Sequence, residues 1–131
     1  MNPIAERIAD FLKDYPPFNS LSFDELILIS VNIRVINLEK NKSLFKINDI
    51  LHDCFYVVAS GTISLTLISD AEETLLNKCK TGDSFGLRPF FAKNNYMMSA
   101  TAREESIVYG IPINIFVKWQ NIFYIKFSCG F

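Results

Sequence analysis

The chain has 131 residues, of which 50% are hydrophobic and 21% charged, a balance typical of a folded protein and not of a disordered chain. Thirteen Lys and Arg against fourteen Asp and Glu leave a formal net charge of −1, without the clustered positive charge that nucleic-acid binding needs. Polar residues interrupt every apolar run well before the about 18 residues that a membrane span requires. We therefore predict a single cytoplasmic domain over residues 1–131, with neither nucleic acid nor a membrane as a partner.

Two helices are predicted over residues 1–32. The first carries apolar residues at helical spacing, namely Ile4, Ile8, Phe11 and Leu12. Charged residues lie among them, so this segment lacks the apolar core of a signal peptide, and Pro16-Pro17 ends the helix. Ser22, followed three residues later by Glu25, forms a capping box that predicts the start of a second helix.

Residues 33–111 change to short runs rich in β-branched and aromatic residues. The runs are 33–38, 44–47, 55–58, 63–67, 74–76, 99–102 and 106–111. Turns are predicted between them at Asn41, Asn48, Gly61, Gly82, Gly86 and Gly110, because Asn and Gly tolerate positive φ. Many short strands without helices between them predict an antiparallel β-roll, a jelly-roll-like architecture also described as a double-stranded β-helix. The predicted fold class is therefore mainly β with flanking helices.

A C-terminal helix is predicted over residues 112–131. Its aromatic residues recur at intervals of three and four, as Phe116, Trp119, Phe123 and Phe127. Further apolar residues make the helix apolar on more than one face, whereas one roll covers a single stripe. We therefore expect these four residues to form an interface with a second copy, giving a homodimer, or with a downstream domain, and we expect the native protein to continue beyond Phe131.

Several segments together resemble the cyclic nucleotide-binding domain family. Gly82-Asp83-Ser84-Phe85-Gly86, followed by Ser99-Ala100-Thr101-Ala102, is similar to the two ends of the family's phosphate-binding cassette. Residues 39–49 resemble its glycine hairpin, with Asn at both glycine positions, and residues 55–61 resemble its aromatic strand. The resemblance implies a non-catalytic regulatory β-roll in which backbone amides of a short helix hold a cyclic phosphate.

Two positions of this cassette depart from the family's pattern. A glutamate after the second glycine normally holds the ribose hydroxyl, and an arginine before the Ser-Ala pair binds the phosphate, but this chain has Leu87 and Met98 there. Each lost charge-assisted hydrogen bond costs about 1.5–3 kcal/mol. The resemblance thus implies a degenerate pocket made of Gly82, Asp83, Phe85, Gly86, Leu87, Arg88, Met98, Ser99 and Ala100. We expect no cofactor and no uptake of cAMP or cGMP in the usual way.

Other interpretations stay open. Arg88 and Lys93 are an alternative source of positive charge inside the cassette. Tyr96, Met97 and Met98 either line an apolar pocket, repurposed for another small-molecule ligand, or fill the core. The domain is also interpretable as a dimerisation or docking module without a ligand. The ending 127–131 resembles the helix that leads, in some bacterial signalling proteins, into CBS domains and a nucleotidyltransferase region.

No catalytic residue and no metal site are predicted. His52, the single histidine, stands beside Asp53 and Cys54, but adjacent side chains point in alternating directions, so we predict a solvent-facing loop histidine. The three cysteines are predicted to be buried thiols, at Cys54, Cys79 and Cys129. A cupin-type enzyme, the competing class of β-roll, needs several histidines and carboxylates around a metal.

Overall fold

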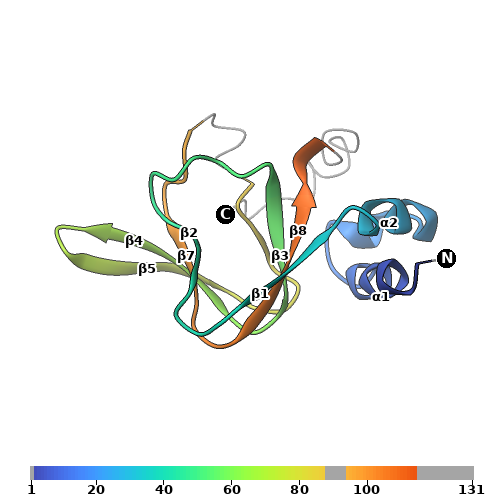
Figure 1. Cartoon of the computed structure of the whole chain (residues 1–131), viewed down its shortest axis with the longest axis horizontal. Coiled ribbons are helices and arrows are strands. Elements are labelled where there is room, and N and C mark those ends of the chain that lie inside the picture. Colours follow the sequence, from blue (N-terminus) through green and yellow to red (C-terminus); the bar gives the residue numbers. More distant parts are fainter. Residues whose placement is uncertain (1, 88–93, 115–131) are drawn as a thin grey trace.

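The computed structural model describes residues 2–87 and 94–114, in which short helices precede two four-stranded antiparallel sheets (Figure 1). The helices are α1 (Pro3–Leu12), the short 3₁₀ helix η1 (Phe18–Ser20) and α2 (Phe23–Ser30). The strands are β1 (Arg34–Leu38), β2 (Ser43–Phe45), β3 (Cys54–Ser60), β4 (Ile63–Ser69), β5 (Glu72–Cys79), β6 (Ser84–Phe85), β7 (Ser99–Ala102) and β8 (Ser106–Pro112). One sheet has the order β1-β8-β3-β6 and the other β2-β7-β4-β5. The predicted β-roll with N-terminal helices is confirmed.

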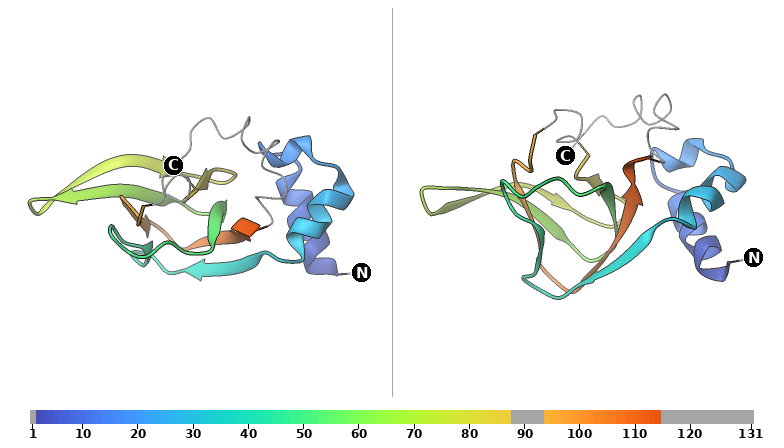
Figure 2. Two further views of the ribbon diagram at one scale, coloured as in Figure 1. Left: turned by 90° about the horizontal axis from the view of Figure 1, so that it is seen from above. Right: turned by 45° about the horizontal axis from the view of Figure 1, so that its top comes forward.

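The two N-terminal helices begin at side-chain caps. The side-chain oxygen of Asn2 accepts hydrogen bonds from the amides of Ile4 (3.0 Å) and Ala5 (3.2 Å), which starts α1. The predicted capping box starts α2: Ser22 Oγ accepts from the Glu25 amide at 3.2 Å, and the Glu25 carboxylate accepts from the Ser22 amide at 2.9 Å. Figure 2 shows both helices at one end of the roll, with the β4–β5 hairpin projecting from the opposite end. Within the described residues, no helix is long and apolar enough to cross a membrane.

Strand β3 separates two hydrophobic cores, because its successive side chains point to opposite faces of the sheet. Phe55 and Val57 point toward the helices and belong to a helix-side core of Ile8, Ala9, Leu12, Phe18, Leu21, Leu26, Ile29, Phe55, Val57, Leu87, Ile111 and Ile113. Tyr56 and Val58 point into the roll and belong to an interior core of Leu38, Phe45, Cys54, Tyr56, Val58, Ile63, Leu65, Cys79, Phe85, Tyr96, Ala100, Ala102 and Val108. Near the end of β6, Phe85 packs in the interior core, whereas Leu87 packs in the helix-side core.

Five of the six predicted turn residues adopt positive φ. They are Asn41 (73°), Asn48 (71°), Gly61 (91°), Gly82 (92°) and Gly86 (86°). The prediction for Gly110 is wrong, because this residue lies inside β8, paired with Arg34 of β1 and Tyr56 of β3. A Cβ there would lie 3.4 Å from Cys54 Sγ and 3.5 Å from the Tyr56 ring, at ordinary van der Waals contact with these interior side chains. Strand β6 was not predicted, since two residues carry no periodicity.

Candidate ligand site

The cassette begins as a tight turn fixed to β3. The amide of Gly82 donates to the Val58 carbonyl at 2.8 Å, and the carbonyl of Asp83 accepts from the Val58 amide at 3.0 Å. The Asp83 carboxylate accepts from the Lys80 amide at 2.8 Å. A Cβ on Gly82 would lie 2.3 Å from the ring of Tyr15, so no side chain fits at this position. Gly82 and the exposed Asp83 therefore shape the turn, and the Asp83 carboxylate is committed to it.

At Gly86 the chain passes from the interior core to the helix-side core. Phe85 is buried inside the roll, with its ring centroid 5.6 Å from that of Tyr56. Gly86 has a φ of +86°, a conformation that side chains rarely adopt. Leu87, only 2% exposed, then packs in the helix-side core. The side chain at the position of the family's ribose-binding glutamate is thus directed away from the roll interior.

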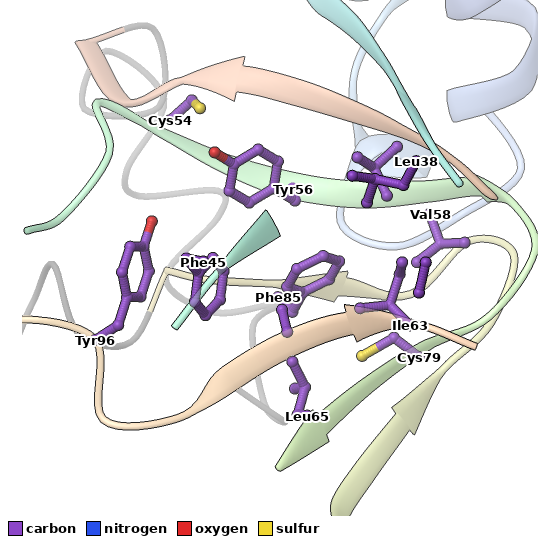
Figure 3. Close-up of a cluster of buried hydrophobic side chains, with 13 residues drawn as sticks. Leu38, Phe45, Cys54, Tyr56, Val58, Ile63, Leu65, Cys79, Phe85 and Tyr96 are labelled. Atoms are coloured by element: carbon purple, nitrogen blue, oxygen red, sulfur yellow. The ribbon is translucent and has the colours of Figure 1, made fainter. Parts of the chain in front are cut away.

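Tyr96, near the far end of the cassette, is buried in the interior core. Its ring is 1% exposed and stacks on the Phe45 ring, with centroids 3.7 Å and planes 6° apart (Figure 3). The Tyr96 hydroxyl accepts from the His52 amide at 3.2 Å. The Tyr96 carbonyl accepts from the Asn48 amide at 2.7 Å, and its own amide donates to the Asp49 carbonyl at 3.1 Å. For Tyr96, core filling is therefore the observed role.

Met98 directly precedes β7, and Ser99 and Ala100 are the first two residues of that strand. Met98 is half-buried against the interior core. Ser99 Oγ accepts from the Ile47 amide at 3.0 Å, so this hydroxyl holds the preceding hairpin. Ala100 is fully buried and pairs with Phe45 of β2. Ser99 and Ala100 thus join β7 to β2 and to the hairpin that follows β2.

The structure brings only part of the predicted pocket together. Phe85, Met98 and Ala100 contact or belong to the interior core, whereas Leu87 belongs to the other core. The predictions for Arg88, Lys93, Phe116, Trp119, Phe123, Phe127 and Cys129 concern residues outside those that the structure describes. Cys54 and Cys79 are buried, as predicted. Among residues 2–87 and 94–114, no group of three or more His, Cys, Asp or Glu side chains is arranged to hold a metal ion.

His52 is half-buried, and the prediction that it faces solvent is wrong. Its Nδ1 lies 2.5 Å from the Tyr56 hydroxyl, and its ring meets the rings of Phe45 and Tyr96 edge-on, with centroids 6.1 and 5.3 Å away. The loop between β2 and β3 runs across the top of the roll in Figure 1, here called its open end, and places this ring against Phe45, Tyr56 and Tyr96. Burial raises the pKa of Tyr96 to about 12 and also raises the pKa of Tyr56, so both phenols stay protonated at neutral pH.

A groove of about 650 Å³ at the same end of the roll was not predicted from the sequence. It is lined by Arg34, Val35, Ile36, Leu44, His52, Asp53 and Tyr56. Arg34 Nη2 lies 3.2 Å from Asp53 Oδ1 and donates to Cys54 Sγ at 3.4 Å. The sequence did contain a signal for this groove. Arg34 lies two residues before Ile36 and four before Leu38, so in a strand its side chain is on the same inward face as theirs.

The sequence model of the cyclic nucleotide-binding domain family matches residues 35–120, well over half of the chain. No curated protein sequence matches this chain. Similar solved structures include the regulatory domain of Toxoplasma gondii PKA with cAMP (21% identity, TM-score 0.76, 87% of this chain and 43% of that one).

Two further structures share the fold. The regulatory subunit of a cAMP-independent protein kinase A from Trypanosoma cruzi, bound to guanosine, has 17% identity and a TM-score of 0.76, over 86% of this chain and 40% of that one. The sensor domain of the transcriptional regulator DNR from Pseudomonas aeruginosa has 19% identity and a TM-score of 0.79, over 88% of this chain and 79% of that one. The chain spans less than half the length of each of these two protein kinase A chains from Toxoplasma gondii and Trypanosoma cruzi. The match over residues 35–120 shows that this chain belongs to the cyclic nucleotide-binding domain family.

Proposed function

We propose that this chain is a regulatory domain that does not take up cAMP or cGMP through the family's usual contacts. One observation carries the proposal: Leu87 stands where the resemblance expects the ribose-binding glutamate, and it is 2% exposed in the helix-side core. A leucine accepts no hydrogen bond from a hydroxyl, and here its side chain does not face the roll interior. The contact to the ribose is therefore lost for two reasons: the side chain has no hydrogen-bond acceptor, and it packs away from the roll interior.

The far end of the cassette supports the same proposal. Met98 stands where the family's phosphate-binding arginine is expected, and a thioether does not neutralise a phosphate. Next to it, Tyr96 is packed on Phe45 and bonded to the His52 amide. A ligand that enters the interior core from this side has to displace a buried aromatic ring, which costs its packing as well as its hydrogen bond.

Structures of the same fold are compatible with regulation that is independent of cAMP. The Trypanosoma cruzi subunit is described as cAMP-independent and bound to guanosine, whereas the Toxoplasma gondii domain holds cAMP. We propose that this chain acts by changing the position of the segment that follows the roll. Such coupling requires a ligand or partner that prefers one position of that segment over another.

The partner proposal rests on the sequence pattern alone. Phe116, Trp119, Phe123 and Phe127 are proposed to contact a second copy or a downstream domain, in a cytoplasmic bacterial signalling protein with CBS domains and a nucleotidyltransferase region. Sedimentation equilibrium of the chain and of its Phe123→Asp variant tests the first possibility. A dimer that becomes a monomer in the variant supports a contact between copies, and a monomeric wild type rejects it.

The ligand proposal is tested by amide NMR spectra of the ¹⁵N-labelled chain with cAMP or cGMP at about 1 mM, a concentration that detects even weak binding. We expect no saturable shift for Gly82, Gly86, Ser99 or Ala100. Saturable shifts confined to these residues would show that the cassette binds the nucleotide and would reject the proposal.

A further inference from the structure

The open end of the roll carries a cation at the rim of an apolar wall. Arg34 lies on the same face of β1 as Ile36 and Leu38, which point toward the roll interior. Across the sheet, Arg34 pairs with Gly110, and Gly110 pairs with Tyr56 on its other side. Beside this position, Arg34 Nη2 donates to the Sγ of the buried Cys54 at 3.4 Å. The groove of about 650 Å³ opens at this point.

The carboxylate partner of the guanidinium is easily replaced, while the bond from Arg34 to Cys54 Sγ stays in place. Arg34 and Asp53 form an ion pair of 3.2 Å, but their side chains are 64% and 90% exposed. Exposed pairs of this kind contribute about 0–1 kcal/mol, so a carboxylate from a ligand replaces Asp53 at little cost. Asp53 thus shows the geometry in which Arg34 holds a carboxylate.

The second polar group of the groove is held in place. His52 Nδ1 is bonded to the Tyr56 hydroxyl, and this contact together with Phe45 and Tyr96 fixes the ring at the groove wall. The oriented imidazole adds a hydrogen-bonding group to the groove, and the guanidinium favours an anion over a neutral ligand. His52 and Arg34 both line the groove.

The remaining lining limits the ligand to a monoanion with an apolar body. Val35, Ile36 and Leu44 supply the apolar wall, and Ile36 and Leu44 pack against the interior core. The groove has one permanent cation, Arg34, and one carboxylate, Asp53, so a dianion would meet repulsion without a second positive charge. A phosphate is therefore a poorer match than a carboxylate.

We infer that this groove binds a small monocarboxylate with a hydrocarbon body, with its carboxylate on Arg34 and its body along Ile36 and Leu44. The inference deepens the proposed function, on which it rests, because it gives the regulatory domain a ligand and a site outside the cassette. None of Gly82, Leu87 or Met98 takes part in it.

Methyl NMR of the whole chain, labelled at Ile, Leu and Val, tests the inference with hexanoate as the charged probe and 1-hexanol as the uncharged one. We expect hexanoate to shift the methyl signals of Leu44 and Ile36 saturably, and Arg34→Gln to weaken this binding at least about tenfold. Arg103→Gln is the matched control, since Arg103 also forms an exposed ion pair, with Glu73, on the other sheet. It is expected to bind hexanoate like the wild type.

Three results would overturn the inference: no saturable shift with hexanoate, equal affinity in Arg34→Gln, or equal affinity for 1-hexanol. Adding cAMP to the same sample separates this inference from the proposed function. Silence toward both probes rejects the groove as a carboxylate site and leaves the proposed function standing. Saturable cAMP shifts at the cassette reject the proposed function itself.

Discussion

The ring of Tyr96 lies parallel to the ring of Phe45, with centroids 3.7 Å apart. Phe45 belongs to β2, whereas Tyr96 belongs to the end of the cassette, so this contact ties the cassette to the roll. Aromatic pairs contribute about 0.5–1.5 kcal/mol beyond the area that they bury. The Tyr96 ring therefore fills the part of the interior core that lies next to the cassette.

Removing the Tyr96 ring should destabilise the fold strongly. We expect Tyr96→Ala to lower the free energy of unfolding by about 3–5 kcal/mol, because it leaves a cavity beside Phe45, and Tyr96→Phe to lower it by about 1 kcal/mol, because it removes only the bond to the His52 amide. Urea unfolding measures both. Met97→Ala is the control, since that side chain is 45% exposed, and equal losses in the two alanine variants would contradict the assigned role.

Tyr96 also predicts how stability depends on pH. Burial raises its pKa from 10.0 to about 12 in the folded chain, so the folded state binds the phenolic proton more tightly than the unfolded state. This contribution is fully present below pH 10 and is lost as the pH rises from 10 to 12. We expect urea midpoints of the wild type to fall over this interval, and those of Tyr96→Phe to fall less. Parallel curves for the two proteins would contradict the prediction.

The fold was largely predictable because its signals are local. The capping box of Ser22 and Glu25 and the positive φ of Asn41 and Asn48 depend on a few neighbouring residues. The site was less predictable, because its contacts join distant segments. Leu87 leaves the roll because Gly86 turns the chain toward the helices, and no periodicity in the sequence reveals that turn.

The open end of the roll shows the same limit. His52 finds its partners on β2, on β3 and near residue 96, so its neighbours in the sequence, Asp53 and Cys54, gave no indication that its ring is half-buried. Arg34 carried a detectable signal, since a charged residue stands in the inward-facing alternation of β1. The groove itself could not be predicted, because it also needs His52 and Asp53 from the loop before β3, and only the fold places that loop beside Arg34.

Restoring the family's acid at Leu87 should harm the fold. We expect Leu87→Glu to cost about 3–5 kcal/mol, since a carboxylate at this position would be buried among apolar side chains without a partner. Leu87→Met keeps the volume and should cost less than about 1.5 kcal/mol. Thermal and urea unfolding compare the two variants. If Leu87→Glu is as stable as Leu87→Met, the side chain at this position is free to turn out of the helix-side core.

The start of α2 offers an independent check of the local structure. Ser22→Ala removes the acceptor for the Glu25 amide and should lower the free energy of unfolding by about 1 kcal/mol. Ser20→Ala is the matched control, because Ser20 is exposed at the end of η1. Chemical unfolding of both variants gives the comparison. Equal stability would mean that the capping bonds add nothing beyond what water supplies.

Isothermal titration of the full chain with cAMP, and separately with cGMP, examines the cassette most directly. With Leu87 packed under the helices and Met98 in place of a guanidinium, we predict no saturable heat for either nucleotide up to about 1 mM. Saturation at micromolar concentrations of either one would contradict this, because it would require a ribose and phosphate contact that these two side chains do not provide.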